Sequence, residues 1–172
     1  MHMTNSNRVA VFGVALFLIV VSLGYSFLPV MASAGEGTFA LDLTGYSLNG
    51  ILQNAVLNVT SVSMNMVLNG NIQTSIGQVP ITATGLWVGT RNGADLSGSI
   101  RDVSGTVYAC FLFWCGQATF VGQGEWSGTL TSTQGTGVFD GTITFTRSDF
   151  SQIQLNQPAP ITGTWMADFQ LA

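Results

Sequence analysis

The chain has 172 residues, of which 47% are hydrophobic and 7% are charged, and its formal net charge at pH 7 is −4. This length favours a single domain with a sizeable core. The shortage of basic residues argues against nucleic acid as a partner.

The N-terminus has the pattern of a secretory signal peptide. Arg8 precedes an unbroken apolar run over residues 9–21, and Ala32-Ser33-Ala34 supplies the small residues that signal peptidase requires. We therefore expect residues 1–34 to be a signal helix that is cleaved after Ala34. The alternative is an uncleaved anchor, because residues 9–30 are long enough to cross a hydrocarbon core of roughly 30 Å.

The remaining domain, residues 35–172, is expected to be secreted or displayed at the cell surface. It would touch a membrane only through an uncleaved signal segment. The chain has no Lys, and cleavage would remove its single His, His2. Without these side chains a protein cannot build a Ser-His-Asp or Cys-His catalytic site, a His-ligated zinc site or a Schiff base. The sequence therefore predicts no enzyme activity, no cofactor and no metal.

Carboxylate pairs are the remaining catalytic option, since some glycosidases use two acidic side chains across a cleft. Glu125 and scattered Asp residues are the acids available in the middle of the domain. A surface role, or a role in stabilising the fold through Ca²⁺, is the favoured interpretation of these side chains.

Alternation of apolar and polar residues runs through the domain and predicts half-buried β-strands. It is clearest over residues 38–44, 138–145 and 165–171. Between Leu57 and Leu68 the apolar positions change from odd to even numbers, which predicts a bulge or a tight bend at Thr60-Ser61.

Turn signals divide these stretches. Asn-Gly pairs favour type I′ hairpin turns and occur at Asn49-Gly50, Asn69-Gly70 and Asn92-Gly93. Further breaks are predicted at Ser104-Gly105, Gly122-Gln123-Gly124, Gly135-Thr136-Gly137 and residues 156–160. Together they predict an all-β domain of about nine to eleven short strands. The architecture is either a single antiparallel β-sandwich, jelly-roll-like, or a barrel.

Four stretches share the pattern apolar-x-Gly-Ser/Thr-apolar, centred on Gly98, Gly128, Gly141 and Gly163. A glycine in mid-strand permits strong bending or the close approach of a bulky neighbouring side chain. Trp126 and Trp165 are the candidates to fill such space. Curved strands over an aromatic core are the favoured interpretation, and an aromatic ligand platform is the alternative.

Two cysteines, Cys110 and Cys115, flank an aromatic segment, and paired thiols of exported proteins normally oxidise. We expect a disulfide between them, with a turn or bulge in the intervening segment. The bridge would present Phe111, Phe113 and Trp114 on a protruding loop, which is either a core plug or a docking surface.

Asn58-Val59-Thr60 matches the acceptor pattern for N-glycosylation, which makes Asn58 a candidate for modification in a glycosylating host.

The signal ending at Ala34, the β-prone arm Gly37-Thr38-Phe39-Ala40-Leu41-Asp42-Leu43 and the single small domain form a recognisable plan. In this plan the chain resembles the bacterial biofilm-matrix fibre proteins and the archaeal bundling pilins. The resemblance implies a head-to-tail homopolymer in which residues 35–48 complete the sheet of a neighbouring copy. Phe39, Leu41 and Leu43 would then be interface residues, and the protein would be a cell-surface filament subunit.

Two alternatives stay open. The first is a monomeric barrel or sandwich that holds a carbohydrate or apolar ligand among Trp87, Trp114, Trp126 and Trp165. The second is an eight-stranded outer-membrane barrel, against which the scarcity of Tyr and the lack of long polar loops argue.

Overall fold

A computed structural model describes residues 35–43, 46–74, 77–111 and 114–172. The predicted signal peptide, residues 1–34, and its cleavage site lie outside the described residues. The described strands are β1 Glu36–Leu43, β2 Tyr46–Leu57, β3 Ser61–Thr74, β4 Gly77–Asn92, β5 Asp95–Phe111, β6 Trp114–Thr131, β7 Gln134–Ser148, β8 Pro158–Asp168 and β9 Gln170–Leu171. No helix within these ranges is long and apolar enough to cross a membrane.

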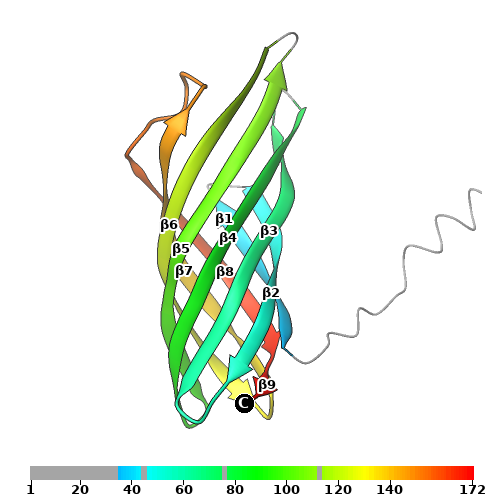
Figure 1. Ribbon diagram of the computed structural model, residues 1–172, viewed down its shortest axis with the longest axis vertical. Helices are drawn as coiled ribbons and strands as arrows, with labels where there is room; N and C mark the ends of the chain where they lie inside the picture. The colour runs from blue at the N-terminus through cyan, green and yellow to red at the C-terminus, as the bar shows by residue number, and fades with distance from the viewer. Residues whose placement is uncertain (1–34, 44–45, 75–76, 112–113) are drawn as a thin grey trace, which may run out of the picture. The chain divides into compact units, whose positions relative to one another are not determined.

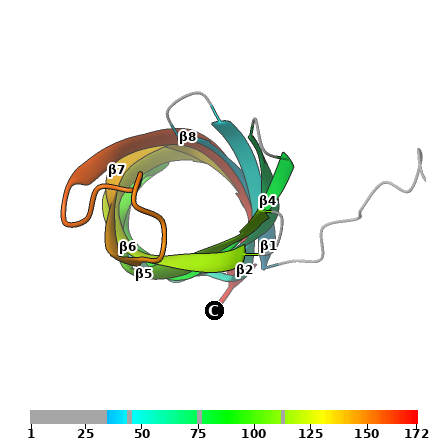
Figure 2. The same ribbon diagram turned by 90° about the horizontal axis from the view of Figure 1, so that it is seen from above.

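The first eight strands form one closed barrel (Figures 1 and 2). Each strand pairs antiparallel with the next along the chain, and β8 pairs antiparallel with β1 to close the sheet. The short β9 pairs in parallel with Val56 and Leu57 of β2, beyond the stretch of β2 that β1 covers. The all-β prediction and the barrel alternative are confirmed, whereas the jelly-roll-like sandwich is wrong because a single sheet curls until its first and last strands meet.

The strands are longer than predicted, because several expected breaks fall inside them. β5 and β6 have 17 and 18 residues, and β6 runs through the predicted break at Gly122-Gln123-Gly124. Asn49-Gly50 and Asn69-Gly70 lie within β2 and β3 instead of forming hairpin turns. Only the third pair, Asn92-Gly93, stands at a turn, where Gly93 has a φ of 66°. The glycines of the predicted breaks therefore lie within strands more often than at turns.

Bends and register shifts in the strands keep apolar side chains on the inside of the barrel. The chain reverses at residues 58–60 between β2 and β3, which confirms the bend expected near Thr60-Ser61. A register shift between Ile100 and Val103 moves the buried residues of β5 from even to odd numbers, from Ile100 to Val103 and Val107. Asp102, inside this bulge, has a φ of 53°. A bulge adds one residue to one strand, so the apolar residues beyond it again point inward.

The two ends of the barrel differ. The lower end in Figure 1 carries the C-terminus and the turns β2–β3, β4–β5 and β6–β7. There the C-terminal tail follows the edge of the wall from β8 to the end of β2: Phe169 N donates to Thr133 O at 2.8 Å, and Ala172 N donates to Leu57 O at 3.1 Å. Phe169 is 2% exposed, so its ring plugs this end. The upper end carries the loop between β7 and β8.

Candidate functional site

Three tryptophans fill the lower half of the barrel. Trp87, Trp126 and Trp165 are each at most 3% exposed, and we call them the tryptophan cluster. The ring centroids of Trp126 and Trp165 are 5.3 Å apart, and Trp87 lies 6.0 Å from the first and 6.3 Å from the second. Phe139 packs edge-on against Trp87 at 5.2 Å. Apart from the tilted pair Trp87–Trp126, these contacts are edge-to-face, and together the rings make an aromatic floor inside the barrel.

Glycines in the wall make room for two members of the cluster. A Cβ atom built on Gly98 would lie 2.8 Å from Trp126 Nε1, and one built on Gly137 would lie 2.7 Å from Trp165 Nε1. Gly98 faces Trp126 across the β5–β6 pair, and Gly137 faces Trp165 across the β7–β8 pair. The expectation that Trp126 and Trp165 fill the space above mid-strand glycines is therefore confirmed.

A small cavity lies above this floor. Its volume is about 40 Å³, and its apolar walls include Leu41, Met66, Leu68, Ile81, Val103 and Ile143. Phe39 and Phe139 also line it, and both rings pack against Trp87 of the tryptophan cluster. Small residues such as Ala83 and Gly122 contribute to the same wall, which is why the space is not filled by side chains. Sequence reasoning missed these lining residues, because only the register of eight strands brings them together.

The interior is uniformly apolar. No polar or charged residue is buried among those that the structure describes. Indole N–H groups reach inside, and one of them, Trp165 Nε1, donates to the backbone oxygen of Ser127 at 3.1 Å. An apolar molecule would therefore meet no competing polar side chain inside the barrel.

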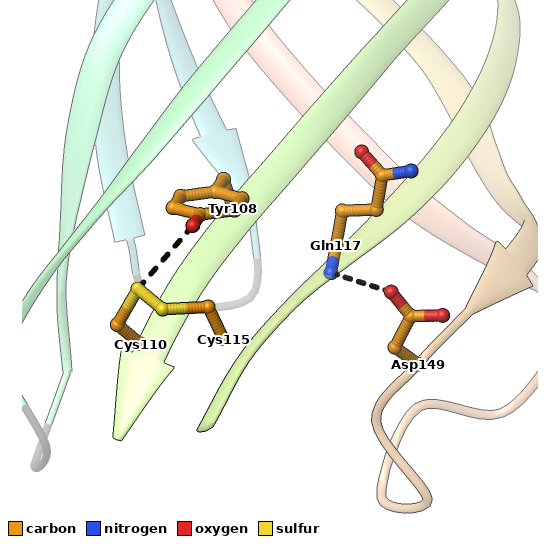
Figure 3. Close-up of a disulfide and its surroundings, with 5 residues drawn as sticks. All are labelled: Tyr108, Cys110, Cys115, Gln117 and Asp149. Atoms are coloured by element: carbon orange, nitrogen blue, oxygen red, sulfur yellow. Dashed lines mark hydrogen bonds between the residues drawn. A yellow bond between two sulfur atoms is a disulfide. The ribbon is translucent and has the colours of Figure 1, made fainter. Parts of the chain in front are cut away.

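The predicted disulfide joins Cys110 of β5 to Cys115 of β6 at the upper rim (Figure 3). The two cysteines are directly opposite each other in the β5–β6 pairing, so the bond joins two antiparallel strands and not two positions of one strand. The Tyr108 hydroxyl donates to Cys110 Sγ at 3.5 Å. Phe111 ends β5, whereas Phe113 lies outside the described residues.

Trp114 begins β6 beside this bridge and is 49% exposed. Its ring packs edge-on against Phe150 of the loop between β7 and β8, with centroids 5.3 Å apart. Asp149 fixes the same loop to β6, because Gln117 N donates to Asp149 Oδ2 at 3.0 Å and Asp149 N donates to Gln117 O at 2.9 Å (Figure 3). Phe150 also packs against the core, so Trp114 helps to hold the loop at the upper end.

Replacing both Cys110 and Cys115 by serine is expected to lower the free energy of unfolding by about 2 kcal/mol, because the bridge closes only a short loop of the unfolded chain. Urea unfolding followed by tryptophan fluorescence measures this loss. The strand pairing of β5 and β6 continues well below the bridge, so the variant should still fold. If the variant is unfolded, the disulfide stabilises the whole barrel and not only its upper rim.

The other residues singled out in the sequence lie in different places. Phe39 and Leu41 point into the barrel, at 2% and 9% exposure, and Leu43 is partly buried against the core. Asn58 is exposed in the turn between β2 and β3, and its Nδ2 donates to Ser61 Oγ at 3.2 Å. Its glycosylation stays a prediction.

Glu125 and Asp140 face each other across the β6–β7 pair, and both are exposed. They border a hollow on the outer wall together with Arg101, Gln123 and Thr142. The residues that the structure describes contain no group of three or more His, Cys, Asp or Glu side chains that could hold a metal ion. A second hollow, over β1, β2 and β8, is lined by Ala40, Ile51 and Met166 among others.

The candidate site is thus the apolar cavity in the upper half of the barrel, closed from below by the tryptophan cluster and Phe169. The residues that line this cavity offer an incoming molecule apolar contacts. No protein-family model, curated protein or solved structure matches the chain.

Proposed function

We propose that this chain is an exported barrel that binds one small apolar molecule in the upper half of its interior. The observation that carries the proposal is the cavity of about 40 Å³ between apolar walls above the tryptophan cluster. An eight-stranded barrel is just wide enough for its side chains to fill it or for it to hold one small ligand. This barrel is filled with aromatic rings in its lower half and incompletely filled above them.

The size of the cavity restricts the ligand. A water molecule occupies about 30 Å³ in the liquid, so the cavity admits little more than one or two methyl-sized groups without rearrangement. Met66 and Leu68 line it, and a methionine side chain adapts its shape at low cost. We therefore expect a ligand no larger than one ring or a short chain, bound with movement of these side chains. A carbohydrate fits poorly, because its hydroxyl groups would lack partners in an apolar interior.

The side chains on the outer wall support the proposal that the barrel is surrounded by water. Exposed positions on β4 and β5 include Thr82, Thr84 and Ser104, while the buried positions of these strands are apolar. A membrane-spanning barrel has the reverse arrangement, with an apolar band facing lipid.

Strand donation stays a prediction. Both edges of β1 are paired within the chain, to β2 and to β8, and Phe39 and Leu41 fill the chain's own interior. A donor-strand filament would require β1 to leave its barrel and enter that of a neighbour. Electron microscopy of the purified protein tests this: filaments would support strand exchange, and single particles of monomer size would contradict it.

Titration with methylenecyclohexane, a compact hydrocarbon, tests the binding function. We expect a saturable change in tryptophan fluorescence, because the cavity adjoins Trp87 through Phe39 and Phe139. Substituting Ala83→Leu, which fills the cavity from its wall, should weaken binding at least about tenfold. The matched control is Thr82→Leu, because Thr82 is the next residue on β4 and is exposed. Absence of saturation, or unchanged binding by Ala83→Leu, would overturn the proposal.

A further inference from the structure

The structure also points to the route by which the apolar molecule reaches the cavity. We infer that it enters from the side of the barrel, between β2 and β3, when the upper part of the β3–β4 pair moves outward. This inference rests on the proposed function, since it assumes that the barrel interior takes a ligand.

The upper part of the β3–β4 pair is joined to neither neighbouring strand in the described part of the chain. The pairing of β3 with β2 reaches up to Leu68, and the pairing of β4 with β5 reaches up to Ile81. Above these two residues β3 and β4 still pair with each other, toward the upper end of the barrel (Figure 1). We call residues 69–72 and 78–80 the β3–β4 ribbon. An isolated two-stranded ribbon is marginally stable in water, so packing must hold this one against the barrel.

Ile72 and Val79 attach the ribbon to the core. They lie directly opposite each other in the β3–β4 pairing, so their side chains point to the same face. Both are buried and belong to the hydrophobic core. Gly70 is two residues from Ile72 and shares this face, and a Cβ built on it would meet Leu48 Cδ2 alone within 4 Å, at 3.9 Å. The contact between the ribbon and the core is therefore loose beside its two anchors.

The upper part of the β5–β6 pair is braced in a different way. The Cys110–Cys115 disulfide joins its two strands, and the hydrogen bonds between Gln117 and Asp149 fasten it to the loop that follows β7 (Figure 3). A covalent bond and backbone hydrogen bonds must break before these strands can separate from each other or from the loop. The β3–β4 ribbon opens at lower cost, because its opening exposes the side chains of its two anchors and leaves the strand pairing around it intact.

The ribbon rises directly from the wall of the cavity. Leu68 and Ile81, the last residues that pair with the neighbouring strands, both line the cavity. Movement of the ribbon about these two residues would therefore open the interior next to the cavity. Segments that cover binding sites commonly open on the microsecond to millisecond timescale.

A hollow on the outer wall marks the same place from outside. It is the hollow over β1, β2 and β8, and its lining also includes Asn49 of β2 and Asn69 of β3. These two residues come immediately above the last β2–β3 pair, Gly50 and Leu68. Phe39 lines both this hollow and the inner cavity. A path from the hollow to the cavity therefore leads between β2 and β3, over Gly50 and beside the ring of Phe39.

The exchange rates of methylenecyclohexane on the full chain test this route. Line shapes of the methyl signals of Leu68 and Ile81 give its association and dissociation rate constants. Ile72→Ala should raise both at least about tenfold, because it removes an anchor of the ribbon. The Kd should stay within about twofold, because Ile72 lies outside the described lining of the cavity. Phe150→Ala is the control for entry past the loop between β7 and β8, and it should leave both rate constants within about twofold.

A cross-link tests the route without weakening the core. Both cysteines of the sequence are in the disulfide, so new thiols can be modified selectively. Asn49→Cys and Asn69→Cys, at exposed positions on either side of the gap, are joined by a short bis-maleimide. This link should slow association and dissociation at least about tenfold. The matched control joins Gln53→Cys and Asn65→Cys, an exposed pair within the β2–β3 ladder, and should change neither rate constant by more than about twofold.

The outcomes separate the route from the function. If methylenecyclohexane leaves the methyl signals of the cavity residues unchanged, the proposed binding function fails. If it binds, and either Ile72→Ala or the link between positions 49 and 69 leaves its rate constants unchanged, the inference is overturned. Faster exchange in Phe150→Ala than in Ile72→Ala would place the entry at the loop between β7 and β8 and overturns it as well. If Ile72→Ala does not fold, the cross-linked protein decides.

Discussion

Replacing Gly137 by alanine is expected to lower the free energy of unfolding by about 3 kcal/mol or more. The new Cβ would collide with the backbone oxygen of Ser127 and would lie 2.7 Å from Trp165 Nε1. Overpacking a dense core costs about 1–3 kcal/mol. Displacing the Trp165 ring would also break its hydrogen bond to Ser127, a further loss of about 1 kcal/mol.

The matched control is Gly70→Ala. Gly70 also lies inside a strand, β3, but the nearest atom to its added Cβ is Leu48 Cδ2 at 3.9 Å. This is ordinary contact, so the substitution should be neutral or should stabilise the barrel by up to about 1 kcal/mol, because alanine has fewer conformations to lose on folding. Urea unfolding of the three proteins measures both effects. If the two variants are equally stable, the packing of Trp165 does not require a glycine at position 137.

The glycine and tryptophan pattern is the part of the fold that sequence reasoning predicted best. Two-residue alternation predicted the strands, and bulky residues near mid-strand glycines predicted where Trp126 and Trp165 pack. The Cys110–Cys115 bridge was also predictable, since two cysteines in a domain expected to be exported have few other roles. These features depend on short sequence distances or on the composition of the chain.

Features set by long-range pairing were not predictable. Asn49-Gly50 has the sequence of a hairpin turn, yet Gly50 lies in mid-strand, where a Cβ would collide with the ring of Phe39 on the neighbouring β1. The preference of Asn-Gly for a hairpin turn is small compared with the free energy gained by burying the ring of Phe39, so the pair lies within a strand. The choice between barrel and sandwich likewise rests on the pairing of β1 with β8, at opposite ends of the domain.

The cavity could not be predicted from the sequence for a related reason. Its walls come from most strands of the barrel, and a bulge decides which face of β5 contributes to it: Val103 lines the cavity because the register shifts after Ile100. A shift of one residue turns every later side chain to the other face. The sequence favoured an aromatic core over a ligand platform for its tryptophans, and three of them are buried in the core beneath an apolar cavity that the sequence did not indicate.

Phe169→Ala is expected to lower the free energy of unfolding by about 3–5 kcal/mol, the usual cost of truncating a buried phenylalanine. Phe169 is 2% exposed, its ring centroid lies 6.4 Å from that of Trp165, and it fills the space over Gly135, where a Cβ would come within 2.6 Å of its Cε2. Truncation would open the lower end of the barrel beneath the tryptophan cluster. The loss corresponds to a fall in Tm of about 10 °C for a domain of this size.

Leu171→Ala is the control for that prediction, because Leu171 belongs to the same C-terminal tail but is 63% exposed. Truncating the Leu171 side chain should cost no more than about 0.5 kcal/mol of stability. The variant keeps the backbone pairing of β9 to β2, so it isolates the contribution of the side chain. Calorimetry of both variants separates the two contributions of the tail. If Phe169→Ala unfolds at the same temperature as Leu171→Ala, the tail closes the barrel through its backbone hydrogen bonds and the aromatic plug contributes little. If the expected difference appears, the buried ring of Phe169 stabilises the lower end of the barrel more than the exposed end of the tail does.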